Sequence, residues 1–567
     1  MKRLLVFIVL IAASPVSMQT FTNQLEIPTL LNGPNFSLTI KRSQKEFLPG
    51  VVTNTFSYND MNYLGPTLVF NKGETVSFNI TNTTDEAATV HWHGFHVPAK
   101  WDGGPQELIE PNTTWSPTFE ILEHASTMWY HSHVHGNTGA QVGKGMAGMI
   151  IIKDDEEANL NLPRTYGEDD IPLILQDKFI DDNGQVQIAN LGSVMMVNGT
   201  LSPYLETPAQ VVRFRMLNAS IERTYNIGFN DNRSYYQIGT DGGLLQEPVN
   251  LNRLRIAPGE RAEILLDLTK ETIGSSLYVM SYGTELGQGV AGAFHNGPGA
   301  GNGPLDSTDF QIMELKITDP TANAVIQIPS SLVKIDFIDT SVIDKIRIKT
   351  LMNPANPGEP FSIDGELFDM NVVNDTVMLG ATEIWRFVNT SSLAHPMHIH
   401  DVQFNIVSRN GSPPPANENG WKDVAFVYPG ETVDVVAKFD DFADSVYAYM
   451  YHCHLLSHED RGMMHRFIVV DPAWYLPTSV ESTKQTESQT AISYYPSPVH
   501  NIVNFNLNRN ANETVIKVYN ILGELIEKKT FYNRPAPSLN LSNVANGFYV
   551  ITLNIDGRNH VMKIIKK

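Results

Sequence analysis

The amino-acid sequence predicts an all-β protein made of three consecutive β-sandwich domains and a smaller β-sandwich at the C-terminus. Short alternating apolar and polar runs, such as residues 66–70 and 75–80, recur between Asn, Gly, Pro and Asp, without helical periodicity. Similar segments at residues 78–82, 214–218 and 385–389 indicate three copies of one plan. The length of 567 residues also suggests three or four domains.

The repeats and the composition place the domain boundaries. The three large domains are predicted at residues 25–155, 165–320 and 330–472. In the second copy, residues 223–227 occupy the place that is rich in histidine in the other two copies, and they contain none. We therefore expect the second domain to bind no metal and to act as a structural spacer.

Composition and the N-terminus limit the possible functions. The chain has 61 acidic and 40 basic residues, a net charge of −21, which argues against a nucleic-acid partner and favours neutral or cationic substrates. Its single cysteine excludes an intrachain disulfide framework. A basic start, an apolar run at residues 4–13 and small or polar residues up to Gln19 predict a secretory signal peptide at residues 1–19.

The single cysteine lies in the segment with the clearest chemistry. Cys453 stands between His452 and His454, and His458 and Met463 follow closely. Thiolate, imidazole and thioether together form a soft ligand set that selects copper. Because side chains alternate along a strand, the thiol faces one side and the two flanking imidazoles face the other. A copper on the cysteine side would therefore be joined by a few covalent bonds to metals on the histidine side.

Histidine pairs of the form His-x-His supply further candidate ligands. The four pairs are His91 and His93, His131 and His133, His398 and His400, and His452 and His454. Each pair places two imidazoles on one face of a strand, roughly 6–7 Å apart. An isolated pair is more often a polar feature of a strand than a metal site. Here ten of the 17 histidines gather in four clusters, one of them around the only cysteine, which favours metal binding.

These four segments resemble, in order and spacing, the four copper-binding motifs of the multicopper oxidases, in the branch of laccase-like, bilirubin-oxidase-like and copper-efflux oxidases. The resemblance covers roughly residues 40 to 472. It implies three cupredoxin-like Greek-key sandwiches, with a trinuclear copper cluster between the first and the third. It also implies four coppers per chain and an enzyme that takes single electrons from a small reducing substrate and reduces O₂ to water.

The resemblance assigns a role to each ligand. For the type 1 copper it implies His395, Cys453, His458 and Met463. For the type 2 copper it implies His91 and His398. For the type 3 pair it implies His93, His131, His133, His400, His452 and His454.

Reduction of O₂ consumes protons, so acids are expected beside the cluster. Asp102 matches the family's acid near the type 2 copper, and Glu459 matches the acid that relays protons to the type 3 side; without the resemblance, either would be an ordinary surface acid. Three further residues are candidates either for supporting the copper sites or for structural roles: Asp423, Asp460 and Trp421. We expect Trp421 to form a wall near the type 1 copper.

The reducing substrate is the least constrained prediction. Copper-efflux oxidases carry a methionine-rich insertion, and place an acid and a methionine four and two residues before the type 1 histidine. Here these positions are Ser391 and Leu393, and no such insertion is present. This difference favours phenols, aromatic amines or bilirubin-like tetrapyrroles. The alternatives are a Cu(I) or Mn(II) oxidase in copper homeostasis, a copper-free binding protein of the same fold, and a copper nitrite reductase.

The C-terminal part has a different character. A polar linker is predicted at residues 473–492. Residues 493–567 resemble the C-terminal sorting domain of the bacterial type IX secretion system, through motifs such as 518–523 and 546–550. The resemblance implies a secreted or cell-surface protein that uses the type IX machinery as a partner. A periplasmic location and a small β-domain for carbohydrate or partner binding remain alternatives, and we expect a monomer.

Overall fold

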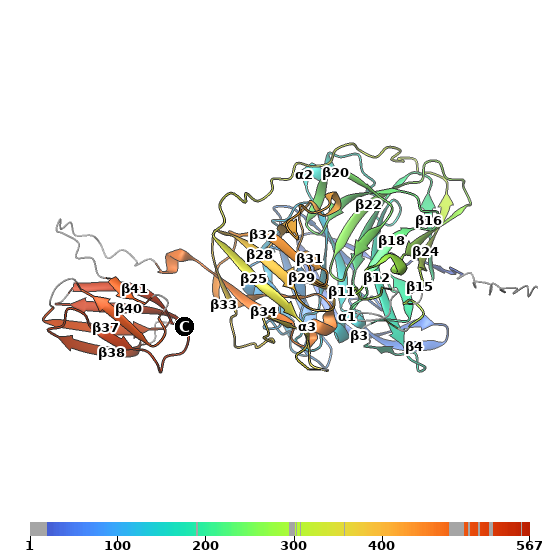
Figure 1. The fold of residues 1–567 in the computed structure, drawn as a ribbon. Coiled ribbons are helices and arrows are strands. Elements are labelled where there is room, and N and C mark those ends of the chain that lie inside the picture. The colour runs from blue at the N-terminus through green and yellow to red at the C-terminus, as the bar shows by residue number, and fades with distance from the viewer. Residues whose placement is uncertain are drawn as a thin grey trace, which may run out of the picture. The chain divides into compact units, whose positions relative to one another are not determined.

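The computed structural model divides into two compact units at Asp471 and Pro472. The described residues are 20–188, 191–293, 301, 303–306, 308–356, 358–475, 493–496, 499–507, 511–520, 525–556 and 558–566. The predicted signal peptide and most of the predicted linker lie outside this set, and the domain boundaries stay predictions. Strands make up half of the structure and helices 5%, so the all-β prediction is confirmed (Figure 1).

The first sandwich has two sheets with a shared core. One sheet has the order β2 (Leu30–Asn32), β5 (Thr67–Asn71), β11 (Ala147–Lys153), β10 (Ser126–His131) and β7 (His91–His93). The other has the order β4 (Val51–Tyr58), β3 (Asn35–Leu48), β6 (Thr75–Asn82) and β8 (Thr114–Trp115), and β9 (Thr118–Glu120) also pairs with β6. Strand β6 alternates as its sequence predicts, because Val76, Phe78 and Ile80 are buried in the core between the sheets.

The second sandwich is the largest. One sheet has the order β15 (Thr200–Leu201), β14 (Val194–Val197), β12 (Asp170–Ile180), β17 (Val211–Asn218), β22 (Arg261–Asp267), β19 (Tyr235–Thr240) and β20 (Gly243–Leu251), and β13 (Val186–Gln187) pairs with β12. The other has the order β1 (Asn23–Gln24), β16 (Pro203–Pro208), β24 (Phe310–Thr318), β23 (Ser276–Ser281), β18 (Tyr225–Phe229) and β21 (Leu254–Ile256).

The third sandwich carries the cysteine segment. One sheet has the order β26 (Ser362–Ile363), β25 (Lys345–Met352), β28 (Ala381–Asn389), β32 (Thr432–Phe439) and β30 (Phe404–Arg409). The other has the order β27 (Asp375–Met378), β34 (Met464–Val470), β33 (Asp444–Cys453), β29 (His395–Ile399) and β31 (Val424–Val427). Cys453 belongs to the core between these sheets.

The threefold repeat is visible at the level of single side chains. Strands β6, β17 and β28 pair in parallel with β3, β12 and β25, and each of the three ends at an asparagine. The amides of Asn82, Asn218 and Asn389 each donate to two backbone carbonyls, one of which is four or five residues ahead and the other 27 to 38 residues ahead. The three segments therefore use one hydrogen-bonding device at equivalent places.

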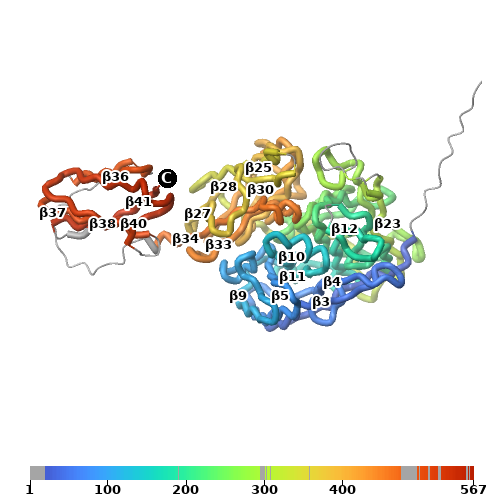
Figure 2. The backbone as a smooth tube through the Cα atoms, turned by 90° about the horizontal axis from the view of Figure 1, so that it is seen from below, coloured from blue at the N-terminus to red at the C-terminus, as the bar shows by residue number. Residues whose placement is uncertain are grey.

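Short helices join the first and third sandwiches. Helix α1 (Thr138–Gly143) follows the second histidine pair, and α3 (Leu456–Asp460) follows the cysteine. The backbone N–H groups of Thr138 and Gly139 donate to the carboxylate of Asp460 at 2.7 and 2.8 Å. Figure 2 shows the blue strands of the first sandwich, such as β5 and β10, close to the orange strands β33 and β34.

The second compact unit has its own core. Its sheets have the orders β35 (Ser493–Tyr495), β36 (Ile502–Asn506), β39 (Ser538–Asn540), and β38 (Leu525–Tyr532), β37 (Glu513–Tyr519), β40 (Gly547–Ile555), β41 (Arg558–Lys566). Buried residues such as Val503, Phe505, Ile516 and Ile551 fill the space between them.

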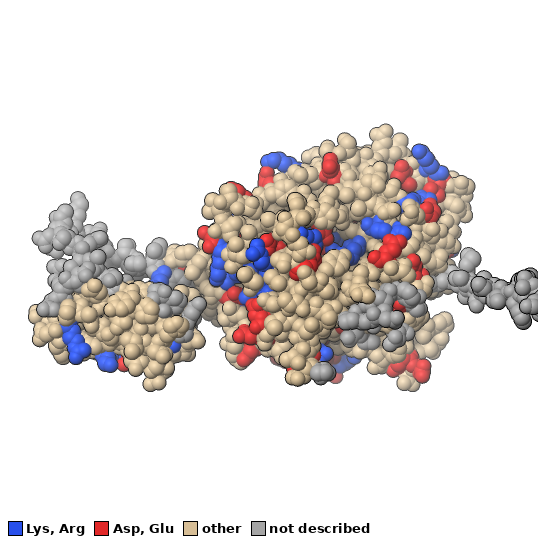
Figure 3. All heavy atoms as spheres, in the orientation of Figure 1, with Lys and Arg blue, Asp and Glu red and all other residues tan. Residues whose placement is uncertain are grey.

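Charge is dispersed over the visible surface. On the face shown in Figure 3, acidic and basic side chains lie in small mixed groups, so the net charge of −21 is not gathered into a single patch there. Across the described part of the chain, no helix combines the length and the apolar character needed to cross a membrane.

Candidate metal centre

Strand pairing brings the four histidine pairs together. In the first sandwich, β7 pairs with β10 so that His91 lies opposite His131. In the third, β29 pairs with β33 so that His398 lies opposite His452 and Met397 lies opposite Cys453. All eight paired histidines are at most 1% exposed. Because burial penalises imidazolium, the pKa values of His131, His133 and His400 lie well below their usual value, which leaves neutral rings able to bind a metal.

Six of these histidines form two separate groups of three. The first triad is His93, His131 and His454, and the second triad is His133, His400 and His452. In the first, Nδ1 of His93 lies 3.4 Å from Nε2 of His131 and 3.3 Å from Nε2 of His454. In the second, Nε2 of His452 lies 3.2 Å from Nε2 of both His133 and His400. Each triad contains histidines from both the first and the third sandwich. The grouping of these six histidines into two triads was not predicted from the sequence.

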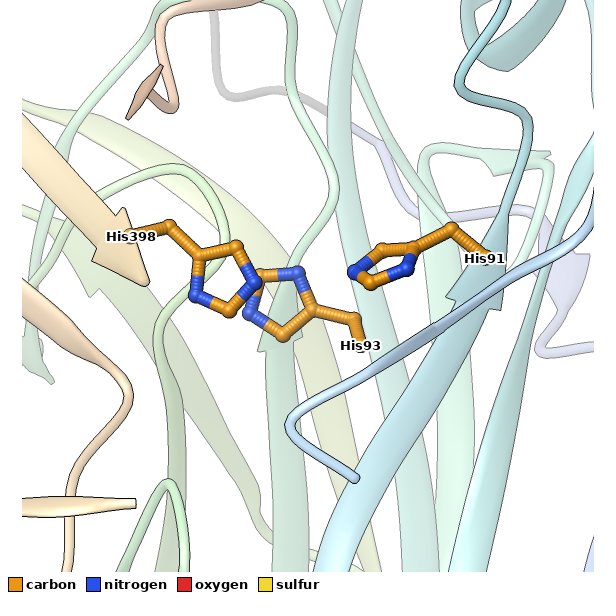
Figure 4. A group of neighbouring side chains, drawn as sticks. All are labelled: His91, His93 and His398. Carbon is orange, nitrogen blue, oxygen red and sulfur yellow. The ribbon is translucent and has the colours of Figure 1, made fainter. Parts of the chain in front are cut away.

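The remaining two paired histidines lie beside the triads. The Nδ1 atoms of His91 and His398 face the backbone carbonyls of Asp102 and Asp423, each at 2.8 Å. Their buried Nε2 atoms have no hydrogen-bond partner among the described residues. Figure 4 shows the rings of His91, His93 and His398 turned toward one another, with His398 on a separate strand. A metal ion would satisfy the two unpartnered nitrogens, because buried polar atoms otherwise carry an energetic cost.

The outer nitrogens of several triad histidines have hydrogen-bond partners, whereas Nδ1 of His133 and of His454 have none among the described residues. Nδ1 of His131 lies 2.8 Å from the carbonyl of Ser132, and Nδ1 of His400 lies 2.7 Å from Oδ2 of Asp102. Such contacts fix the ring orientation and the tautomer of a metal-binding histidine. The rings of His131 and His400 are therefore held in orientation without a metal.

The predicted type 1 ligands gather on the other side of β33. Nδ1 of His395 lies 3.3 Å from the sulfur of Cys453, and Nδ1 of His458 lies 3.7 Å from it. Met463 is fully buried, and its backbone is bonded to both Cys453 and His458. A thiol and two imidazoles that meet, with a buried methionine bonded through its backbone to two of these residues, fit a blue-copper site.

Two other residues border this site. The Ser391 hydroxyl lies 2.7 Å from the outer nitrogen, Nε2, of His395. The Phe361 ring stacks on His458 with centroids 4.5 Å apart and meets His395 edge-on at 5.2 Å. Phe361 was not predicted from the sequence, which has no motif at that position.

Both predicted acids lie at the triads. Asp102 follows the short helix η1 (Ala99–Trp101), is fully buried, and contacts His400 through Oδ2 as described above. Glu459 lies on α3, with Oε1 3.4 Å from Nδ1 of His133 and Oε2 3.3 Å from Nδ1 of His452. Burial, and secondarily the charge of Asp460, raises the pKa of Glu459 well above its usual value. The acids face different sides of the second triad.

The further candidates differ in role. Asp460 caps the start of α1, which is a structural function. Asp423 supports the first triad, because its Oδ1 lies 3.0 Å from Nε2 of His93. Trp421 lines two adjoining cavities of 190 and 510 Å³ together with His124 and Asp336, and none of the predicted type 1 ligands lines either cavity.

The second sandwich contributes a residue that the sequence analysis missed. Arg261 is buried, and its guanidinium donates to Oδ1 of Asp423 at 2.7 Å. It directly follows the turn 258–260, whose pattern recurs at 429–431, and this position is the only sequence signal for it. The prediction that the second domain is only a spacer is therefore incomplete, since it helps to hold the first triad.

Family models support the same organisation. Three models described as "Multicopper oxidase" match residues 39–157, 129–302 and 339–473. A fourth, described as "Secretion system C-terminal sorting domain", matches residues 493–567.

Curated relatives match most of the chain. "Multicopper oxidase mco" of Staphylococcus haemolyticus is 31% identical over 76% of this chain and 87% of its own length. "Cell division protein FtsP" of Photorhabdus laumondii is 32% identical over 81% of this chain and 96% of its own length.

Solved structures give the same result. McoA multicopper oxidase from Aquifex aeolicus is 34% identical, covers 79% of this chain and 99% of its own, and has a TM-score of 0.71. The laccase-like multicopper oxidase CueO from Ochrobactrum sp. is 32% identical, covers 79% of this chain and all of its own, and has a TM-score of 0.70. The chain thus belongs to the multicopper oxidase family, is an oxidoreductase with cupredoxin-like sandwiches, and carries a C-terminal sorting domain.

Proposed function

We propose that the protein is an exported oxidase with four coppers, which couples one-electron oxidation of phenols, aromatic amines or bilirubin-like substrates to the reduction of O₂ to water. The observation that carries this proposal is the arrangement of eight buried imidazoles as two triads and a pair, contributed equally by the first and third sandwiches. The thiol of Cys453 belongs to the group that it forms with His395 and His458. The imidazoles of its neighbours His452 and His454 belong to the two triads.

The proposed ligand assignment follows the groups. Type 1 copper is held by His395, Cys453, His458 and Met463, type 2 copper by His91 and His398, and the type 3 coppers by the first and second triads. When bound, copper at these sites accepts single electrons and supplies them to O₂. The family supports copper as the cofactor, and the number of four is part of the proposal.

The chain itself provides the electron path. Cys453 lies at the end of β33, and its main chain runs directly to His452 and His454. These imidazoles belong to different triads, so a few covalent bonds connect the thiol with both. The reducing substrate therefore needs to reach only the proposed type 1 site.

Two carboxyl groups lie beside the second triad, where O₂ reduction would consume protons. Burial raises the pKa of the Glu459 carboxyl well above its usual value, which favours a protonated acid beside Nδ1 of His133 and Nδ1 of His452. Asp102 accepts a hydrogen bond from the outer nitrogen of His400, which fixes the ring. Together the two acids serve opposite sides of the second triad.

The type 1 surroundings support organic substrates. The group next to the outer nitrogen of His395 is the neutral hydroxyl of Ser391, and Leu393 lies two residues before that histidine, so neither an acid nor a thioether is available to attract a cuprous ion at these positions. The related Ochrobactrum enzyme is described as acting on lignin model compounds. A Cu(I) or Mn(II) oxidase is the alternative for this site.

The ends of the chain support export. The sorting-domain match at residues 493–567 supports passage through the type IX machinery to the surface or the medium. A signal peptide at residues 1–19 would direct the chain to the periplasm first. We propose that the mature enzyme acts as a monomer.

The test is copper counting combined with oxygen uptake. We expect blue protein with four coppers per chain that consumes O₂ with phenols or bilirubin. Two coppers per chain would instead indicate a nitrite reductase, and colourless protein would indicate a binding role. Efficient turnover of Cu(I) alone would show that the interpretation of Ser391 and Leu393 is wrong.

A further inference from the structure

A second buried carboxyl lies close to Asp102 and has no part in the function proposed above. Glu107 follows five residues later, in the segment between η1 and β8, and is 8% exposed. Neither of its carboxylate oxygens makes a hydrogen bond of good distance and angle with another described residue. The backbone of Gly104 and the side chain of Gln106 lie close enough only to lower the pKa of the carboxyl secondarily. Buried carboxyl groups with a purely structural role are normally hydrogen-bonded, so this one calls for a functional explanation.

Glu107 and Asp102 border the same small space, beside Gly104. A Cβ atom placed on Gly104 would lie 3.4 Å from Oε2 of Glu107 and 3.6 Å from Oδ2 of Asp102. The second of these oxygens is the one that lies 2.7 Å from Nδ1 of His400. The space beside Gly104 thus connects an unused carboxyl with the acid at the second triad, over a distance that bridging water can span.

The charges around Glu107 favour a protonated carboxyl. Burial, and secondarily the charge of Asp102, raises the pKa of Glu107 to about 9. The facing cation is Arg466 on β34, whose guanidinium donates to the side chain of Gln106 at 3.0 Å; no ion pair with Glu107 is found within the described part of the chain. At neutral pH the carboxyl therefore carries a proton that it can give up.

We infer that Glu107 is a proton-supplying residue of the oxidase, which delivers protons from solvent into the space that it shares with Asp102. The inference rests on the proposed function. In each cycle the O–H bond of Glu107 breaks as its proton enters that space, and a proton from solvent then restores it. No electron is transferred in this step. Glu107 acts through Asp102 and touches no copper ligand in the contacts described above.

Three variants and one control test this inference in the copper-loaded protein. Glu107→Gln keeps the size of the side chain and removes the exchangeable acid, so kcat should fall about tenfold and its pH profile should lose the alkaline limb. The KM of the reducing substrate and the anaerobic rate of bleaching of the blue colour should not change. Glu107→Asp should restore part of kcat. Glu110→Gln changes an exposed acid in the same segment and should have no effect.

Gly104→Ala tests the space itself. Gly104 does not have a positive φ, and a methyl group there would make ordinary contacts with both carboxyls, so the fold should tolerate it. The methyl group should lower kcat although both acids remain. Infrared difference spectra of copper-free protein give an independent readout. The wild type minus Glu107→Gln should show one protonated-carboxyl component that belongs to Glu107, above the bands of other buried acids such as Glu459, and the wild type minus Gly104→Ala should not show that component.

The outcomes are separable. An unchanged kcat and pH profile in Glu107→Gln would overturn the inference, as would the absence of a protonated-carboxyl component from the difference spectrum between the wild type and Glu107→Gln. A wild-type protein that binds no copper and consumes no O₂ would instead overturn the proposed function, while the infrared result would still report whether Glu107 holds a proton. If Glu107→Gln fails to fold, Gly104→Ala and Glu107→Asp decide the question by their kcat values.

Discussion

Nε2 of His93 lies 3.0 Å from Oδ1 of Asp423, a residue 330 positions further along the chain. The same oxygen accepts a hydrogen bond from Arg261 at 2.7 Å. The guanidinium of Arg261 also donates to the carbonyls of Thr127 at 3.1 Å and Gly259 at 2.8 Å. One buried cation therefore connects all three sandwiches at the first triad, and leaves Nδ1 of His93 to face the metal position.

Arg261→Gln should damage both the fold and the first triad. The substitution leaves Asp423 buried without its cation, which we expect to cost about 3–5 kcal/mol of unfolding free energy. It also frees the His93 ring, so copper should be lost from the cluster while the blue colour remains. Urea unfolding of copper-free protein and copper counting measure the two effects. Arg253→Gln, in the same sandwich but on an exposed ion pair, is the control; equal behaviour of the two variants would contradict the assignment.

Cys453→Ser should abolish the blue colour and oxygen uptake. The alcohol is a poor copper ligand, so the chain should bind one copper fewer and lose the thiolate absorption. The triads lie on the opposite side of β33 and should keep their metal. Visible absorption and copper analysis are the measurements. A blue Cys453→Ser protein would disprove the type 1 assignment.

Ser391→Asp should lower the potential of the type 1 site. The Ser391 hydroxyl lies 2.7 Å from Nε2 of His395, so a carboxylate at this position would stabilise the more positive, oxidised site. Each tenfold stabilisation corresponds to about 60 mV. We also expect faster turnover of Cu(I) relative to phenols. Redox titration against the wild type, with Ser392→Asp at a neighbouring exposed position as control, measures the shift; an unchanged potential would show that Ser391 does not act on the ring.

Glu107 should make stability depend on pH. Its pKa is about 9 in the folded protein, against an ordinary value of 4.5, so between these values the folded state binds a proton that the unfolded chain has released. The stabilisation is complete below about pH 4.5 and is lost as pH rises toward 9, by at most about 1.4 kcal/mol per pH unit. Denaturation of copper-free wild type and Glu107→Gln at several pH values measures the difference. A constant difference would mean that the carboxyl is already ionised at neutral pH.

Much of the site was predictable because its motifs are local. In His91-Trp92-His93, both histidines lie within strand β7, where alternation alone turns their side chains to one side. In the other three pairs only the first histidine lies in a strand, or at its end, and the second follows just after the strand has ended. The all-β fold followed equally from alternation, as in β6. Such features depend only on near neighbours in sequence.

What could not be predicted depends on the pairing of distant strands. The division of six histidines into two triads requires knowing that β7 meets β10 and β29 meets β33. Arg261 reaches Asp423 across 162 positions. In β25 the alternation misleads, because Arg347 is buried against Glu383 while Ile346 and Ile348 are 49% and 56% exposed. Ion-pair partners rather than hydrophobicity decide which face of that strand points inward.

The first triad spans the sequence almost from end to end of the larger unit, since His93 and His454 are 361 positions apart. A copper ion held between them would close the polypeptide into a large ring, as a disulfide does in many exported proteins, and this chain has no pair of thiols for that purpose. Copper binding would thus be the last stabilising step of maturation, because it requires that both ends of the ring have been synthesised and docked. A chain that binds copper before it crosses the outer membrane would cross it in its folded, metal-cross-linked form.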